Sequence, residues 1–267
     1  MEAIHTVVTR NDIMQGLALL GLEEGMVVEV HSSLSSFGYV VGGAQTVVDA
    51  LIDIVGRTGT ILMPMQCSDN TEPANWINPP IDPELNPVVR KNMPAFNVYN
   101  TEAVNMGAIV ENFRRREGVV FSNHPTSAFC ARGRYAKLLT NRHSLHFGLS
   151  GESPVSRLYE LKGSVLLLGV GYDNCTCMHL AEYLAECRPI IVNGSAISVE
   201  GRQTWKKYLD LDIDSDIFKQ IGQVLEGKGL VSHMKIGNCD AILFNATQAV
   251  DEAVRYLDAQ CIYNLYR

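Results

Sequence analysis

The sequence predicts an α/β protein with a central mixed, largely parallel sheet flanked by helices and with antiparallel hairpins toward the C-terminus. In the front half, short apolar runs stopped by glycine alternate with amphipathic segments. The strands expected at residues 27–30 and 60–64 are separated by one helix, which implies a right-handed βαβ unit. The back half instead alternates apolar with polar residues, as hairpins do. Since no repeat or linker divides the 267 residues, we expect a single domain over residues 1–267.

The first elements form a helix followed by a strand, a loop and a second helix. Thr9 or Asn11, with Asp12, can cap a helix that runs to about Leu20 and ends at Gly21. After the strand at 27–30, a loop rich in hydroxyls and glycine precedes the helix expected at 44–55. Such an arrangement presents backbone N–H groups to an anion, although a plain turn between strand and helix explains the glycines equally well. Neither a GxGxxG fingerprint nor a Walker lysine is present, so a nucleotide is not specifically indicated.

The middle of the chain contains a long excursion and several loops. After the strand at 60–64, whose edge Pro64 is expected to close, periodicity is lost over residues 65–94. A segment of that length is usually a functional loop or lid, and otherwise a solvated loop. A helix over 102–116 and a strand over 127–131 follow, and between them His124 is held extended by the next proline. We expect the segment 141–149 to lie on the surface, with His143 and His146.

The best candidate for chemistry is the stretch around residues 166–182. A short apolar run leads through a polar turn into a helix that we expect to extend from His179 to about residue 187. His179 and Glu182 stand three apart and share one helix face, so the carboxylate can orient the imidazole. At the mouth of an α/β sheet, such a pair suits a general base. The alternative is a solvated helix face that happens to carry both residues.

The C-terminal third should hold the hairpins and the last helices. A hairpin is expected over 194–204, and a row of acids follows along residues 208–216. Beyond it we expect a helix over 217–225, strands at 231–236 and 240–244, and a closing helix over 246–258.

Composition excludes several classes of protein. The formal net charge is −7 and no basic stripe is present, so nucleic acid is an unsuitable partner. No apolar run approaches about 20 residues, and the polar N-terminus is no signal peptide, so we expect no membrane span and a cytoplasmic location. The seven scattered cysteines agree with a reducing compartment.

Taken in order, four segments of the chain resemble the aminoglycoside 3-N-acetyltransferase family. They are VHSSLSSFGYVVGGAQTVVDAL, GTILMPM, MGAIVENFRRREGVVFSNHPTSAFCARG and GESPVSRLYELKGSVLLLGVGYDNCTCMHLAE, and the likeness covers roughly residues 10–260. The resemblance implies an α/β fold distinct from the common GNAT acetyltransferase architecture, with acetyl-CoA as donor. It also implies a cationic aminoglycoside as acceptor, acetylated at the 3-amino group of its 2-deoxystreptamine ring, and hence antibiotic resistance. A monomer or a homodimer is compatible with it.

The family's residues are carried over by motif. His179 and Glu182 match the HxxAE motif and would act as general base and its partner in direct transfer, with Thr176 or nearby N–H groups on the oxyanion. The donor site would consist of the loop after residue 30 and residues along the pantetheine arm: His31, Ser32, Ser33, Leu34, Ser35, Phe37, Gly38, Val40, Met65, His124 and Ser127. Contacts to the cationic acceptor are assigned to Asp69, Glu102, Asp173, Asp210 and Asp212, each of which is otherwise a surface charge.

Other functions stay open on the sequence. The acceptor could be an amine other than an antibiotic. Where the family commonly has Ser or Asn, this chain has Cys175 and Cys177, which with His179 resemble a zinc cluster and suggest a metal-dependent hydrolase. A cysteine acyl-enzyme and a non-catalytic acyl-CoA-binding protein are further alternatives. The preferred reading, direct acetyl transfer, needs no metal.

Overall fold

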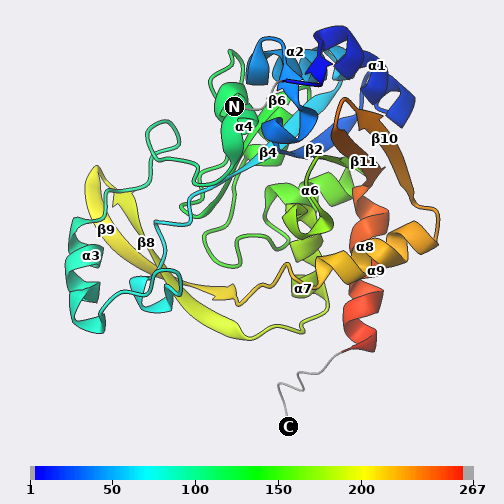
Figure 1. Cartoon of the computed structure of the whole chain (residues 1–267). Coiled ribbons are helices and arrows are strands. Elements are labelled where there is room, and N and C mark those ends of the chain that lie inside the picture. Colours follow the sequence, from blue (N-terminus) through cyan, green and yellow to red (C-terminus); the bar gives the residue numbers. More distant parts are fainter. Residues whose placement is uncertain (1–3, 261–267) are drawn as a thin grey trace.

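The computed structural model of the chain describes residues 4–260, which form a seven-stranded mixed sheet with helices on both faces (Figure 1). The strand order is β10-β11-β7-β2-β4-β6-β5. Its centre consists of β2 (Val27–Ser32), which pairs in parallel with β4 (Thr60–Gln66) and with β7 (Ser164–Leu168). The outer ladders, from β4 to β6 to β5 and from β7 to β11 to β10, are antiparallel. The predicted mixed α/β sheet is therefore confirmed, but it is not largely parallel as expected: two of its ladders are parallel, at the centre, and the four outer ones are antiparallel.

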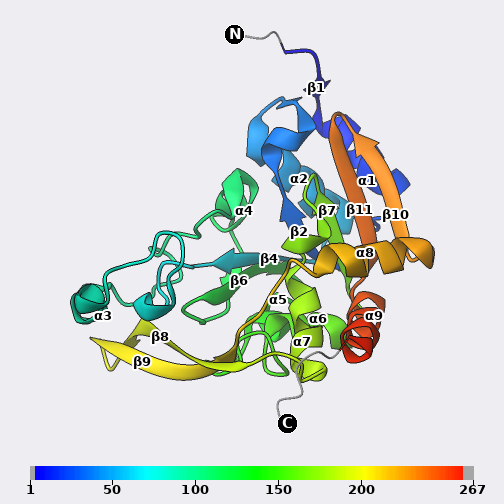
Figure 2. The ribbon, with the colours of Figure 1, turned by 60° about the horizontal axis from the view of Figure 1, so that its bottom comes forward.

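The central strands are apolar throughout because helices cover both of their sides. Val28 and Val30 of β2 pack in the core under α1 (Arg10–Leu20) and α2 (Gly43–Val55). Successive side chains of a strand point to opposite faces, so Val27, Glu29 and His31 face the other layer. That second layer contains α6 (Pro154–Glu160), α7 (His179–Leu184) and α9 (Ala246–Ala259) (Figure 2).

The remaining elements complete the two layers and a lobe beside the sheet. They are β1 (Val7–Val8), η1 (Leu34–Phe37), β3 (Tyr39–Val40), η2 (Pro73–Asn75), η3 (Pro83–Leu85), α3 (Asn86–Asn92), α4 (Gly107–Phe113), β5 (Val120–Phe121), β6 (Ser127–Gly133), α5 (Ala136–Thr140), η4 (Tyr172–Asn174), η5 (Thr176–Met178), β8 (Ile190–Val199), β9 (Arg202–Leu211), α8 (Phe218–Gly227), β10 (Val231–Ile236) and β11 (Cys239–Asn245). Within the described residues 4–260, no helix has the length and apolar character needed to cross a membrane.

Three expected elements have different boundaries in the structure. The helix predicted over 102–116 is only α4 (Gly107–Phe113), because Asn105 and Gly107 have positive φ and a right-handed helix cannot pass through them. In α7, the left-handed Glu186 similarly ends the helix before residue 187. Pro64 does not close a strand edge, since β4 continues to Gln66. The ladder from β2 ends opposite Leu62, however, so Pro64 lies where β4 pairs with β6 alone.

The excursion expected over 65–94 is neither structureless nor detached. Met65 and Gln66 still belong to β4, and η2, η3 and α3 give the rest local order. The segment packs on the β8–β9 hairpin, which extends well beyond the predicted 194–204 and forms a separate lobe beside the main sheet (Figure 1). Buried Asn70 fastens the two: its amide donates to the Ala196 carbonyl at 3.1 Å and accepts from the Ala196 N–H at 2.9 Å.

We expect Asn70→Ala to loosen this lobe. The change leaves the buried N–H of Ala196 without its partner, which costs about 1–3 kcal/mol, whereas the Ala196 carbonyl keeps its bond from the Phe96 N–H. Urea unfolding should show the loss, and limited proteolysis should cut faster between residues 67 and 94. The matched control is Asn75→Ala, since Asn75 is exposed; equal proteolysis of the two variants would contradict the role given to Asn70.

Candidate active site

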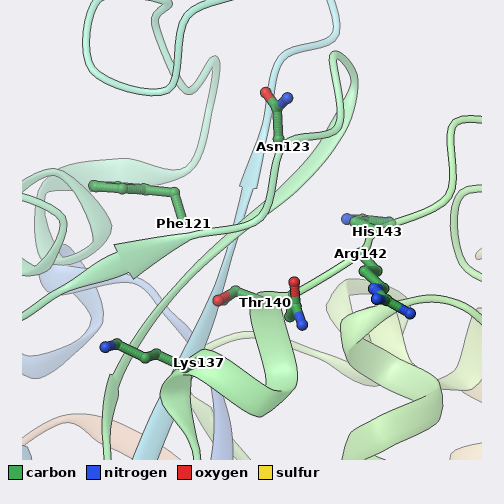
Figure 3. Close-up of a pocket in the computed structure, with 7 residues that line it drawn as sticks. Phe121, Asn123, Lys137, Thr140, Arg142 and His143 are labelled. Carbon is green, nitrogen blue, oxygen red and sulfur yellow. The ribbon is translucent and has the colours of Figure 1, made fainter.

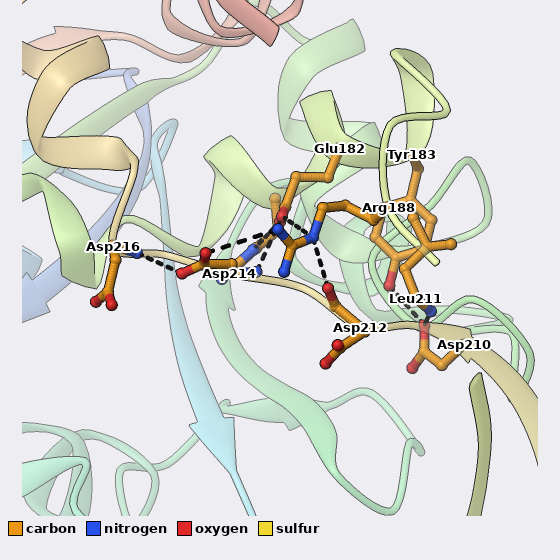
Figure 4. Close-up of polar contacts among 9 residues, drawn as sticks. Glu182, Tyr183, Arg188, Asp210, Leu211, Asp212, Asp214 and Asp216 are labelled. Atoms are coloured by element: carbon orange, nitrogen blue, oxygen red, sulfur yellow. Dashed lines mark hydrogen bonds and ion pairs between the residues drawn. The ribbon is translucent and has the colours of Figure 1, made fainter. Parts of the chain in front are cut away.

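His179 and Glu182 form a buried pair at the start of α7. The Nδ1 atom of His179 lies 2.5 Å from Oε2 of Glu182, and the ring packs edge-on against Phe218 with centroids 4.7 Å apart. The other carboxylate oxygen of Glu182 accepts from the N–H of Asp214 at 2.9 Å and lies 3.4 Å from Nε of Arg188 (Figure 4). Glu182 is thus held at both oxygens.

The pairing determines what the imidazole can do. With its Nδ1 proton directed at the carboxylate, the neutral ring carries its lone pair on Nε2. Packing against Phe218 and the bond to Glu182 fix the ring orientation. A histidine arranged in this way can take a proton from a group that approaches Nε2.

Thr176 and His31 lie together at the carboxyl ends of β7 and β2. The N–H of Thr176 donates to Nε2 of His31 at 3.3 Å, and the N–H of Cys177 donates to Oε2 of Glu29 at 3.2 Å. Both amides therefore already have partners within the protein. The side chain of Thr176 is buried within η5, three residues before His179.

The loop after β2 has the expected compact form. The N–H of Ser33 donates to the Leu168 carbonyl at 2.9 Å, and η1 follows, with the hydroxyls of Ser33 and Ser35 3.1 Å apart. Gly38 has a φ of 88°, and a Cβ there would lie 3.1 Å from Thr6, so glycine is required. The loop residues Ser32, Ser33 and Leu34 are partly exposed and Ser35 is exposed, whereas Phe37, Val40 and Met65 are buried in the core.

His124 and His143 stack in a second polar cluster behind β6. Nδ1 of His124 accepts from the N–H groups of Ser127 at 2.9 Å and Thr126 at 3.2 Å, and its ring centroid lies 4.7 Å from that of His143. Burial, with a smaller contribution from His143, lowers the pKa of His124 to about 3. Burial likewise lowers the pKa of His143 to about 4, although its bond to the Gly148 carbonyl opposes the shift. Of the two histidines expected on the surface, His146 is exposed and His143 is half-buried, with its ring lining a pocket.

Of the five acidic residues assigned to the acceptor, Asp210 alone is buried. Its carboxylate accepts from the Tyr183 hydroxyl at 2.6 Å and from the N–H of Leu211 at 2.9 Å (Figure 4). Burial raises its pKa, while the bond to Tyr183 and the charge of His179 oppose the shift, which places Asp210 within electrostatic reach of that ring. The remaining four do not join it: Asp173 pairs with Lys219 at 3.0 Å, and Asp69, Glu102 and Asp212 are exposed.

Sequence reasoning missed the residues that support this pair. Arg188 donates to the Asp212 carbonyl at 2.6 Å and lies 3.6 Å from a carboxylate oxygen of Asp214, and so ties the strand end to Glu182. The alternating acidic residues of the segment 208–216 could have indicated Asp214 as a site residue. Tyr183 carried no such signal, because a tyrosine on a helix is ordinarily a packing residue.

The zinc set expected from the sequence does not assemble. In the part of the chain that the structure describes, the group able to ligate a metal is Glu29, Cys175 and Cys177. His179 is not in it, because its ring is directed at Glu182. A hydrolase site built from Cys175, Cys177 and His179 is thus incompatible with this geometry.

Two pockets border these clusters. One of about 620 Å³ lies beside the histidine stack and is lined by Phe121, Asn123, Lys137, Thr140, Asn141, Arg142 and His143 (Figure 3). Although it is the larger, none of its residues touches the His179–Glu182 pair. The other, of about 390 Å³, includes Tyr183, Arg188 and Leu211, which contact Asp210 and Glu182. The second pocket is therefore the one adjacent to the candidate chemistry.

Comparison with known proteins identifies close relatives. The sequence model of the family described as aminoglycoside 3-N-acetyltransferase matches residues 30–258. The SPbeta prophage-derived aminoglycoside N(3')-acetyltransferase-like protein YokD of Bacillus subtilis is 43% identical, over 93% of this chain and 92% of that protein. Aminoglycoside N(3)-acetyltransferase IX of Micromonospora chalcea is 32% identical, over 95% of this chain and 94% of that protein.

Solved structures agree over the whole fold. The structure of AAC-IIIb with CoASH has a TM-score of 0.85 at 27% identity, covering 95% of this chain and 97% of that one. AAC-VIa bound to sisomicin has a TM-score of 0.84 at 25% identity, covering 96% of this chain and 99% of that one.

The buried histidines should make stability depend on pH. Their pKa values are about 3 and 4 in the folded chain and near 6.5 when unfolded, so the unfolded state binds more protons as pH falls. We expect the free energy of unfolding to be fully present above about pH 6.5 and to fall below it, by up to about 1.4 kcal/mol per pH unit for each histidine. Urea unfolding between pH 7 and 4.5 measures this slope. His143→Gln should reduce it and the exposed His5→Gln should not; an unchanged slope in His143→Gln would refute a neutral buried ring.

Proposed function

The chain belongs to the aminoglycoside 3-N-acetyltransferase family, and from that premise we propose that it transfers acetyl from acetyl-CoA to the 3-amino group of 2-deoxystreptamine aminoglycosides. The observation that carries the mechanism is the buried His179–Glu182 pair, 2.5 Å apart at the start of α7. We further propose that the chain is one domain, distinct from the GNAT architecture, and acts in the cytoplasm as a monomer or homodimer. The free thiols of Cys67, Cys130, Cys175, Cys177 and Cys239 agree with that compartment.

We propose that the donor lies along the loop after β2. A similar structure, AAC-IIIb, contains CoASH, which supports CoA as the acyl carrier here. His31, Ser32, Ser33, Leu34, Ser35 and Gly38 would line its phosphates and pantetheine by backbone and hydroxyl contacts, with His124 and Ser127 further along. Phe37, Val40 and Met65 would support this wall from the core, since their side chains are buried beneath it.

In the proposed reaction, the neutral acceptor amine attacks the thioester carbonyl while Nε2 of His179 takes one of its protons. A C–N bond forms, and the carbonyl electrons move onto oxygen, where the hydroxyl of Thr176 can donate. The intermediate then collapses, the C–S bond breaks, and the protonated imidazole returns its proton to the departing thiolate. The products are the N-acetylated aminoglycoside and free CoA. Glu182 stabilises the transient imidazolium, as a carboxylate 2.5 Å from Nδ1 must.

Asp210 suits the acceptor because it offers a buried negative charge close to the base. An aminoglycoside carries several ammonium groups, and a carboxylate attracts a cation more strongly in a buried place than in water. Asp212 and Asp214 extend this acidic surface along the end of β9 (Figure 4). We assign Asp173, Asp69 and Glu102 weaker, peripheral parts, since they are exposed or paired elsewhere.

We expect His179→Ala to lower kcat about 10²-fold or more while CoA binding is largely kept, because the base is lost but the donor loop is not. Thiol release from acetyl-CoA with sisomicin or gentamicin measures turnover, and calorimetry with CoA measures binding. Cys177→Ala should lose far less turnover than His179→Ala. If the cysteine variant were dead and the histidine variant active, a covalent acyl-enzyme would replace the proposed direct transfer.

We expect Asp210→Asn to raise the KM for the aminoglycoside about tenfold and to leave the KM for acetyl-CoA unchanged, because it removes a charge while keeping the size of the side chain. Steady-state kinetics with each substrate varied in turn separates the two. Asp212→Asn is the matched control, since Asp212 is exposed on the same strand end. Equal effects of the two variants would show that only the overall surface charge matters.

A further inference from the structure

A compact group of ligand atoms lies outside the proposed transfer chemistry. Glu29 on β2 and Cys175 and Cys177 around η5 each contribute one such atom, and these three atoms lie within 4.8 Å of one another. Each residue is at most 1% exposed, so the group is enclosed by protein. Its members come from segments almost 150 residues apart that the β2–β7 pairing brings together.

The carboxylate of Glu29 is incompletely satisfied. Its Oε2 accepts from the N–H of Cys177 at 3.2 Å, but its Oε1 has no hydrogen-bond partner among the described residues. The neighbouring His31 offers no compensating proton at Nε2, because that atom already accepts from the N–H of Thr176. A buried carboxylate without a counter-charge is costly, so an ionised Glu29 requires a positive charge beside it.

The two sulfur atoms fit a shared ion. Their separation is 3.6 Å, and two thiolates on one tetrahedral zinc at about 2.3 Å stand about 3.8 Å apart. Two thiols in van der Waals contact have a similar spacing, so this distance allows a shared ion without requiring one. The observation that favours the ion is the unpaired carboxylate oxygen of Glu29. Soft thiolate ligands combined with one carboxylate select zinc over magnesium or calcium, which prefer oxygen ligands only.

We propose that Glu29, Cys175 and Cys177 bind a thiophilic divalent cation of the zinc class. As the two metal–sulfur bonds form, each thiol releases its proton to solvent, and the ion neutralises the buried carboxylate. The Nε2 atom of the neighbouring His31 lies 3.4 Å from Oε2 of Glu29, and the ring would have to turn away from the Thr176 N–H to become a fourth ligand. The site joins β2 to the segment that leads into α7.

This metal site would be structural: it adjoins the proposed transfer site at Thr176 and His31 but holds no reacting atom. The ion would fix residues 175–177 and so the start of α7, where His179 begins the helix. His179 itself takes no part, since its Nδ1 is directed at Glu182. The sequence predicted that acetyl transfer needs no metal, and this stays a prediction about the reaction. The proposed ion would instead stabilise the fold.

Titration of the purified, metal-stripped full chain with Co²⁺ tests the proposal. We expect one equivalent to bind with the near-ultraviolet thiolate-to-cobalt absorption that oxygen ligands do not produce, and Zn²⁺ to displace it. Cys177→Ser and Glu29→Gln should each weaken binding at least about 10- to 100-fold, since losing a ligand costs no less than losing an outer-shell partner. Cys67→Ser is the matched control, because Cys67 is equally buried but outside the group.

Two results would overturn the proposal. One is absence of stoichiometric thiolate absorption in the wild-type chain, or absorption that survives in Glu29→Gln and Cys177→Ser alike. The other is a Cys175–Cys177 disulfide found by thiol counting and mass spectrometry in protein purified without added oxidant. Circular dichroism of the metal-stripped variants shows whether each one folds. If Cys177→Ser does not fold, the comparison of the wild-type chain with Glu29→Gln tests the proposal.

Discussion

The parallel pairing of β2 with β7 is the constraint on which the site depends. It places His31 opposite Leu167 and continues into the bond from the Ser33 N–H to the Leu168 carbonyl. Two loops thereby leave the same sheet edge side by side, as the carboxyl ends of adjacent parallel strands must. The first loop is suited to the donor, and the second leads to the histidine of α7. A register shift of one residue would turn Glu29 and His31 into the opposite layer, under α1 and α2.

Around this edge, the buried charges are neutralised in different ways. Glu182 has His179 on one oxygen and the Asp214 N–H and Arg188 on the other, so both of its buried oxygens have partners. The His124–His143 stack avoids charge instead, because burial keeps both rings neutral near pH 7. Among the described residues, Glu29 is the buried acid with a carboxylate oxygen that has no partner. The two thiols beside it are therefore the candidate ligands of a neutralising cation.

Sequence patterns were sufficient for the sheet centre and for the contact between His179 and Glu182. Buried strands such as β2 and β7 are continuous apolar runs, and a spacing of three makes His179 and Glu182 neighbours on any helix. The patterns failed where long-range contacts decide. The segment around His143 looks like surface by composition, yet its ring is half-buried, with Ser122 and the Gly148 carbonyl satisfying both ring nitrogens. Asp210 and Asp214 lie near α7 only because the end of β9 returns toward that helix. No local periodicity of the sequence predicts this return.

The same long-range dependence couples the excursion to the acceptor side. Asn70 bonds both backbone groups of Ala196 on β8, and Ala196 pairs with Trp205 on β9, the strand that carries Asp210 near its end. The position of Asp210 relative to His179 is therefore set from two sides, by Tyr183 on α7 and by a hairpin that the excursion holds. If Asp210 binds the acceptor as proposed, sequence changes between residues 67 and 94 should alter acceptor preference by shifting the hairpin. The proposed donor loop should be less affected, because it follows β2 at the sheet centre and not the hairpin.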